Sequence, residues 1–113
     1  MAITVTAGVD YNCKYPCFHA AADAYAGNGI GTVLADRTPE EWIELCEAGL
    51  PGYDRLDKPE PGALLVFHYR DKLWHVGVYL GCDKFFHIRK NRTAIERLNK
   101  YSKSLVGAYK CQI

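Results

Sequence analysis

The spacing of apolar residues changes once along the chain, from a helical period in the first part to alternation in the second. In "PCFHAAADAYAG" (16–27), apolar residues recur at i, i+3, i+4 and i+7 from Phe18 to Tyr25, which places them on one stripe of a helix. Pro16 suits the first turn, where a backbone donor would be unpaired anyway. The Gly27–Gly29 segment suits the helix end. This stretch is therefore predicted to be the first helix.

A second helix is predicted to follow Thr38. Thr38 can act as its N-cap, and Glu41, three residues later, completes a capping box. The apolar residues from Trp42 to Cys46 give this helix a buried side. Gly49 is expected to close it.

The second half of the chain is typical of strands, with β-branched and aromatic residues in short runs separated by polar turns. Residues 50–62 contain three prolines and are expected to form a loop. The predicted strands are "ALLVFHY" (63–69), "KLWHVGVYL" (72–80), "KFFHI" (84–88), "TAIERL" (93–98) and "LVGAYKCQ" (105–112). Helices first and hairpin-spaced strands later predict one α+β domain over residues 1–113. We expect its N-terminal helices to pack on a four- or five-stranded antiparallel sheet.

Composition and charge narrow the classes of partner. The chain has 113 residues, 49% of them hydrophobic and 24% charged, with a formal net charge of +1. This balance is ordinary for a soluble domain and gives no electrostatic reason to expect a nucleic-acid partner. No apolar run approaches the ~18 residues of a membrane span. The first residues lack a basic segment followed by an apolar run, so we expect synthesis in a cytosol.

The five cysteines form no obvious framework. Their number is odd, so at least one thiol is free or pairs with another chain. Cys13 and Cys17 are four residues apart, a poor spacing for a zinc site, and no CxxC pair exists. Disulfides are disfavoured in a reducing cytosol. Because the cysteine spacing does not suit a zinc site, no metal is predicted, and no cofactor is predicted either.

Three positions form a candidate catalytic set. Cys17 opens the first predicted helix, where unpaired N–H groups and the helix dipole favour a thiolate, so we expect a lowered pKa. An imidazole from His75 could take up the thiol proton and return it to a leaving amine. His87, twelve residues later, could fix the tautomer of His75. The alternative is that His75 is a partly buried core histidine with a hydrogen-bond partner.

The hairpin between the two histidines sets a geometric condition. Side chains alternate along a strand, so His87 shares the face of His75 only if the connection between the two strands has an odd number of residues. A three-residue loop, Gly81-Cys82-Asp83, would satisfy this condition. A two-residue loop would turn His87 to the other face unless a β-bulge restored it. Both alternatives stay open in the sequence.

Four segments resemble the NlpC family of cell-wall cysteine peptidases. "HVGVYLGCDKFFH" (75–87) resembles the family's histidine motif, and "PGALLVF" (61–67) resembles the strand that precedes it. "PCFHAAADAY" (16–25) resembles the nucleophile helix, especially in tailed-phage tail-tip proteins, with Asp23 and Tyr25 at the acidic and aromatic positions. "LVGAYKC" (105–111) resembles the closing strand. The similarity covers the chain from about residue 11 to 110.

The resemblance implies a papain-like α+β fold and hydrolysis of an amide in the peptidoglycan stem peptide, between γ-D-glutamate and a diamino acid. It implies that Cys17 is the nucleophile, His75 the base and His87 the orienting residue. Cys13 is an alternative nucleophile, but Pro16 would then fall at the fourth helical position, where proline is unfavourable.

Residues beside the catalytic set are assigned to substrate binding: Tyr15, Phe18, His19 and Trp74. His19 lies around the helix from Cys17 and is expected at the rim. Tyr11 or Tyr15 could line the cleft or assist the oxyanion.

The partners implied are the peptidoglycan stem peptide and phage tail-tip or hub proteins, without nucleic acid and without membrane insertion. The protein is expected to reach the cell wall on a virion tail. An alternative function is a weakly active or inactive assembly subunit of a tail tip on the same fold. Pro16, Phe18-His19 and Ala63, which depart from the family pattern, motivate this alternative.

Overall fold

A computed structural model describes residues 3–28, 37–69 and 73–110, and it confirms the α+β fold class. Two helices precede the strands, as the change of period predicts. The elements are α1 (Pro16–Gly27), α2 (Pro39–Glu47), β1 (Asp54–Leu56), β2 (Leu64–His68), β3 (Trp74–Gly81), β4 (Lys84–Arg89), β5 (Arg92–Arg97), the 3-10 helix η2 (Leu98–Tyr101) and β6 (Leu105–Lys110). Gly29, Lys72 and the end of the last predicted strand at 111–112 lie outside the described residues.

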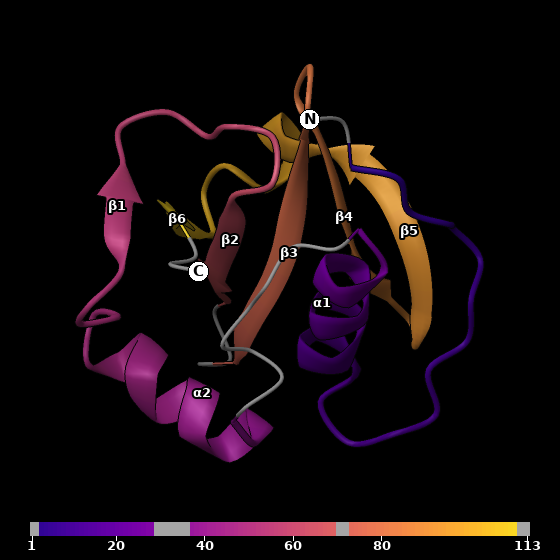
Figure 1. Cartoon of the computed structure of the whole chain (residues 1–113), viewed down its shortest axis with the longest axis horizontal. Helices are drawn as coiled ribbons and strands as arrows, with labels where there is room; N and C mark the ends of the chain where they lie inside the picture. Colours follow the sequence, from indigo (N-terminus) through magenta and orange to yellow (C-terminus); the bar gives the residue numbers. More distant parts are fainter. Residues whose placement is uncertain (1–2, 29–36, 70–72, 111–113) are drawn as a thin grey trace.

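The strands form one antiparallel sheet in the order β1-β6-β2-β3-β4-β5 (Figure 1). Strands β2 to β5 are joined as successive hairpins, and β6 returns to lie beside β2. The prediction that residues 50–62 form only a loop is wrong, because β1 lies within them, and the sheet has six strands where four or five were predicted. Asp54–Leu56 is short and mostly exposed, and among the described strands it pairs with β6 alone, at the sheet edge. Such a strand has no apolar alternation to reveal it.

The two helices begin in different ways. At α2 both bonds of the predicted capping box are present: the Glu41 N–H donates to Thr38 Oγ1 at 3.2 Å, and the Thr38 N–H donates to Glu41 Oε1 at 3.0 Å. At α1 the N-cap is Tyr15, which has left-handed backbone angles (φ 57°, ψ 55°) and no side-chain cap bond. Left-handed angles cost a non-glycine residue about 1 kcal/mol or more. The sharp turn at Tyr15 delivers Pro16 and Cys17 directly into the first helical turn.

The sheet separates two apolar clusters. The first lies between α1 and the sheet, as predicted, with α1 over β3 and β4 (Figure 1). It contains Phe18, Ala21 and Tyr25 from α1 and Val76, Val78, Phe86 and Ile88 from the sheet. The second cluster, on the opposite face, contains Leu65, Phe67, Phe85, Leu98 and Ala108. Alternate residues of β3 therefore face different clusters, and His75 faces the second.

The β3–β4 hairpin uses the second of the two geometries left open by the sequence. Cys82 and Asp83 form a tight turn, both with positive φ (52° and 62°). The register shifts between Tyr79 and Gly81, which marks a β-bulge. The bulge adds the extra residue that a two-residue turn lacks, so His75 and His87 share a face.

Gly77 is required by the close approach of β4. A Cβ at this position would lie 2.9 Å from both the Phe85 ring and the Phe86 carbonyl oxygen and 3.3 Å from the His87 Cβ. We expect Gly77→Ala to lower the free energy of unfolding by about 1–3 kcal/mol, because the strand backbone must shift to admit the methyl group. Urea unfolding measures the effect. Gly27→Ala is the matched control, because a Cβ at Gly27 meets nothing within 4 Å; equal stability losses in both variants would contradict the interpretation.

Candidate active site

Cys17 lies in the first turn of α1 and is 8% exposed. Burial raises the pKa of its thiol, and hydrogen bonds from the backbone N–H groups of Val76, Phe18 and Cys17 offset this only in part. The expectation of a lowered pKa is therefore wrong for the free protein. Removal of the sulfur from water outweighs the favourable helix start.

His75 lies near the start of β3 and is 9% exposed. Its ring packs against those of Phe67 and Tyr69, each with a centroid separation of 5.6 Å. Its Nε2 is joined to His87 Nδ1 by a 2.9 Å hydrogen bond. Burial, and then the neighbouring His87, lower the pKa of His75 to about 3. His75 is thus a neutral imidazole at neutral pH, with Nδ1 as the nitrogen left for other chemistry.

Cys17 and His75 line the same pocket. Cys17 belongs to the apolar cluster between α1 and the sheet, whereas the His75 ring packs against Phe67 on the opposite face of the sheet. The pocket has a volume of about 320 Å³ and lies where α1 and β3 begin. The backbone N–H of Val76, which directly follows His75 in β3, is among the groups that lower the pKa of the Cys17 thiol. A thiol and an imidazole therefore line one cavity where α1 and β3 begin.

The other lining residues partly match the predicted substrate contacts. Tyr15 and Trp74 line the pocket, and the Trp74 ring stacks on that of His68 with centroids 4.2 Å apart. Phe18 is only 3% exposed and belongs to the core, so we do not expect it to touch substrate. His19 is exposed and is not among the lining residues. The sequence did not single out four further lining residues: Ile43, Glu47, Leu73 and Ile88.

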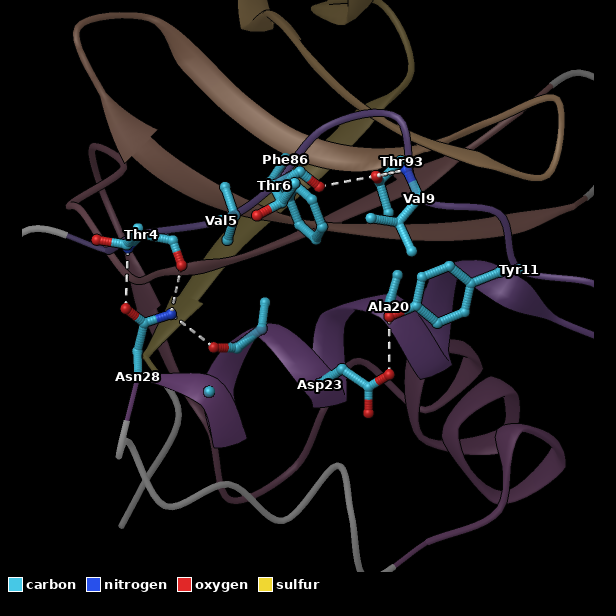
Figure 2. A pocket seen from close by; sticks show the side chains of 12 residues that line it. Thr4, Val5, Thr6, Val9, Tyr11, Ala20, Asp23, Asn28, Phe86 and Thr93 are labelled. Atoms are coloured by element: carbon cyan, nitrogen blue, oxygen red, sulfur yellow. Dashed lines mark hydrogen bonds between the residues drawn. The ribbon is translucent and has the colours of Figure 1, made fainter.

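The acidic and aromatic positions of α1 hold other segments in place. The Tyr11 hydroxyl donates to Asp23 Oδ2 at 2.7 Å, and the Tyr25 hydroxyl donates to the Gly62 carbonyl at 3.0 Å. Figure 2 shows Tyr11 reaching Asp23 across a separate pocket between the N-terminal segment and α1. Burial and the Asp23 carboxylate raise the pKa of Tyr11 to about 12. Of the two tyrosines before the helix, only Tyr15 therefore lies at the cysteine pocket.

Beyond His87 the polar contacts continue into β5 and η2. His87 Nε2 is 2.8 Å from Glu96 Oε1, and the Tyr101 hydroxyl donates to the same oxygen at 3.0 Å. Burial lowers the pKa of His87. Burial alone would raise the pKa of Glu96, but hydrogen bonds from His87 and Tyr101 lower it overall. Sequence reasoning missed Glu96 and Tyr101.

The sequence positions in the β4–β5 hairpin could have indicated that Glu96 lies near His87. His87 pairs with Ala94 across the β4–β5 hairpin. Glu96, two residues after Ala94, therefore shares the face of His87. A carboxylate on the face that carries the apolar cluster of Phe67, Phe85 and Leu98 needs a polar partner.

Of the cysteines in the described part of the chain, Cys17 alone lines the pocket that contains His75. Cys13, Cys46 and Cys82 are free thiols, and Cys46 is buried in the core. Within residues 3–28, 37–69 and 73–110, no three His, Cys, Asp or Glu side chains are grouped to hold a metal ion. In the same ranges, no helix has the length and apolar character needed to cross a membrane.

Fold and site together define a class: a papain-like α+β domain with a cysteine at a helix start beside a histidine pair on an antiparallel sheet. The model of the NlpC/P60 family matches residues 17–109, and the chain belongs to this family. Membership indicates a cysteine peptidase of the cell wall, with peptidoglycan as substrate. In a comparison with curated proteins, none matches the chain.

Proposed function

We propose that the protein hydrolyses an amide bond of the peptidoglycan stem peptide through the triad Cys17, His75 and His87. The observation that carries this proposal is the buried 2.9 Å bond between His75 and His87, beside a pocket that Cys17 and His75 share. A core histidine needs a partner, but it does not need a cysteine at a helix start and a cavity beside it. The family match supports the same chemistry.

The raised thiol pKa favours a general-base mechanism over a preformed ion pair. As substrate binds, His75 Nδ1 takes the proton of Cys17 while the sulfur attacks the amide carbonyl carbon. The carbonyl electrons move to oxygen, and N–H groups at the start of α1 can stabilise this oxyanion. The tetrahedral species expels the amine, which receives the proton from His75. Water, activated by His75, then hydrolyses the thioester, giving a carboxylate and the free thiol.

We place the scissile bond between γ-D-glutamate and the diamino acid. The pocket is largely apolar, with Ile43, Leu73 and Ile88, and Glu47 supplies a carboxylate at its edge. A single carboxylate in such a site suits a substrate with an ammonium group, which stem peptides carry on the diamino acid or at the N-terminus.

Digestion of defined stem peptides tests the proposed bond. We expect the tetrapeptide L-Ala-γ-D-Glu-diaminopimelate-D-Ala to give two dipeptides, identified by mass spectrometry. A matched peptide with an α-linked glutamate controls for recognition of the unusual linkage. Cleavage elsewhere, or equal cleavage of the two peptides, would contradict the assigned bond.

We further propose that the protein acts as a component of a phage tail tip during cell-wall penetration, in contact with tail-tip or hub proteins. The support is the resemblance of residues 16–25 to the nucleophile helix of such proteins. Mass spectrometry of purified virions of the encoding phage tests it: the proposal requires the chain in intact particles, and its absence from them would refute the location.

One observation favours the second candidate, an assembly subunit with little activity. Cys17 is buried and its thiol pKa is raised, as expected for an inert structural cysteine. The two candidates differ in whether removal of the sulfur changes hydrolysis.

A further inference from the structure

Glu96 is a largely buried carboxylate that the proposed triad leaves without a role. Its side chain is 11% exposed, and its Oε1 contacts both His87 Nε2 and the Tyr101 hydroxyl. Its other oxygen lies 3.7 Å from Arg89 Nη1, whose side chain is 61% exposed. A carboxylate in such surroundings is costly unless its partners are well placed. The position of Glu96 behind the orienting histidine suggests what it contributes.

The polarity of the hydrogen bonds follows from the carboxylate. An ionised Glu96 can only accept, so the proton of a neutral His87 must lie on Nε2. His87 Nδ1 is then bare and can only accept, so His75 must place its proton on Nε2. This leaves His75 Nδ1 bare. A bare nitrogen is what a general base needs to remove the proton of Cys17.

We propose that Glu96 is a positioning residue that fixes the tautomers of both histidines and so keeps His75 ready to act as base. This inference rests on the proposed function for its effect on catalysis, but the tautomers can be observed without turnover. Without Glu96, His87 can carry its proton on Nδ1 and donate to His75 Nε2. The neutral His75 then holds its proton on Nδ1, so the nitrogen that should take up the Cys17 proton is a donor and cannot accept it.

The charged and titratable groups around this network come from three strands and the 3-10 helix η2. They are His75 on β3, His87 and Arg89 on β4, Glu96 on β5 and Tyr101 on η2. Arg89 and the Tyr101 hydroxyl both favour the ionised carboxylate. Tyr101 therefore supports Glu96, and we expect Tyr101→Phe to have a smaller effect than loss of the carboxylate.

The test combines kinetics with nitrogen NMR of the full chain labelled with 15N-histidine. Two-bond N–H correlations identify the protonated nitrogen of each ring. In the wild type we expect the proton on Nε2 of both His75 and His87. In Glu96→Gln we expect a measurable fraction of both rings to shift to the Nδ1–H form, because an amide can donate to His87 as well as accept. We expect kcat on a stem-peptide substrate to fall by about 10- to 100-fold.

Glu44→Gln is the matched control. Glu44 is exposed on α2, so its substitution removes the same charge at a position away from the site. Glu96→Asp keeps a carboxylate and should retain more of the wild-type tautomer than Glu96→Gln. Unchanged tautomers in a folded Glu96→Gln would overturn the proposal. If the wild type shows no hydrolysis, the proposed function fails, while the NMR result still decides the role of Glu96.

Discussion

Replacing Cys17 with alanine is expected to lower kcat for stem-peptide cleavage by on the order of 10⁴-fold or more, because no other group can form the thioester. The side chain loses only one atom at a small buried site, so the fold should persist. Product release followed by chromatography measures the activity, and circular dichroism checks the fold. Cys17→Ser should be nearly as inactive, because a hydroxyl is a far weaker acid than a thiol and His75 is a weak base.

Cys13→Ala is the control for this experiment. Cys13 is the alternative nucleophile in the sequence, but it is exposed and is not among the residues that line the pocket. We expect its removal to change kcat by less than about 3-fold, as for surface substitutions away from a site. Loss of activity in Cys13→Ala alone would move the nucleophile to Cys13. Equal product release, or none, from wild type and Cys17→Ala would favour the assembly subunit.

Much of the fold could be predicted because local and tertiary preferences agree. Thr38 and Glu41 satisfy orphan donors within one helical turn, so their sequence spacing alone fixes where α2 begins. The stripe from Phe18 to Tyr25 likewise marks the face of α1 that packs on the sheet. β1 could not be predicted, because its pairing depends on β6, more than fifty residues later, and its own residues carry no apolar pattern.

Three candidate residues of the site could be selected from the sequence, but Glu96, Tyr101 and the electrostatics of the site could not. Cys17, His75 and His87 followed from a helix start and two strand histidines. The direction of the pKa shift of Cys17 could not be predicted in the same way. It depends on whether burial or the N–H groups of the helix start have the larger effect, and the sequence indicates the helix start but not the burial. The register that places His87 beside His75 depends on a bulge between Tyr79 and Gly81, which the turn sequence left undecided.

The second large effect is expected at His75. His75→Gln should lower kcat by on the order of 10³- to 10⁴-fold, because the amide can still bond to His87 but cannot take up a proton from the thiol. His68→Gln is the matched control on the adjacent strand. Since the His68 ring stacks on Trp74 at the pocket, we expect a change of at most about 3-fold, in KM more than in kcat.

The pH dependence of the wild type tests the same residue independently. Burial and His87 hold the pKa of His75 at about 3, so the base stays unprotonated as pH falls below the ordinary histidine range. Activity should therefore remain flat from neutral pH to about pH 5 and be lost only as pH approaches 3, provided the fold survives. On the basic side, the raised thiol pKa of Cys17 places its ionisation above the ordinary cysteine range. An acid limb of kcat/KM near pH 6.5 would mean that the catalytic imidazole is solvated, which contradicts a base buried against Phe67 and Tyr69.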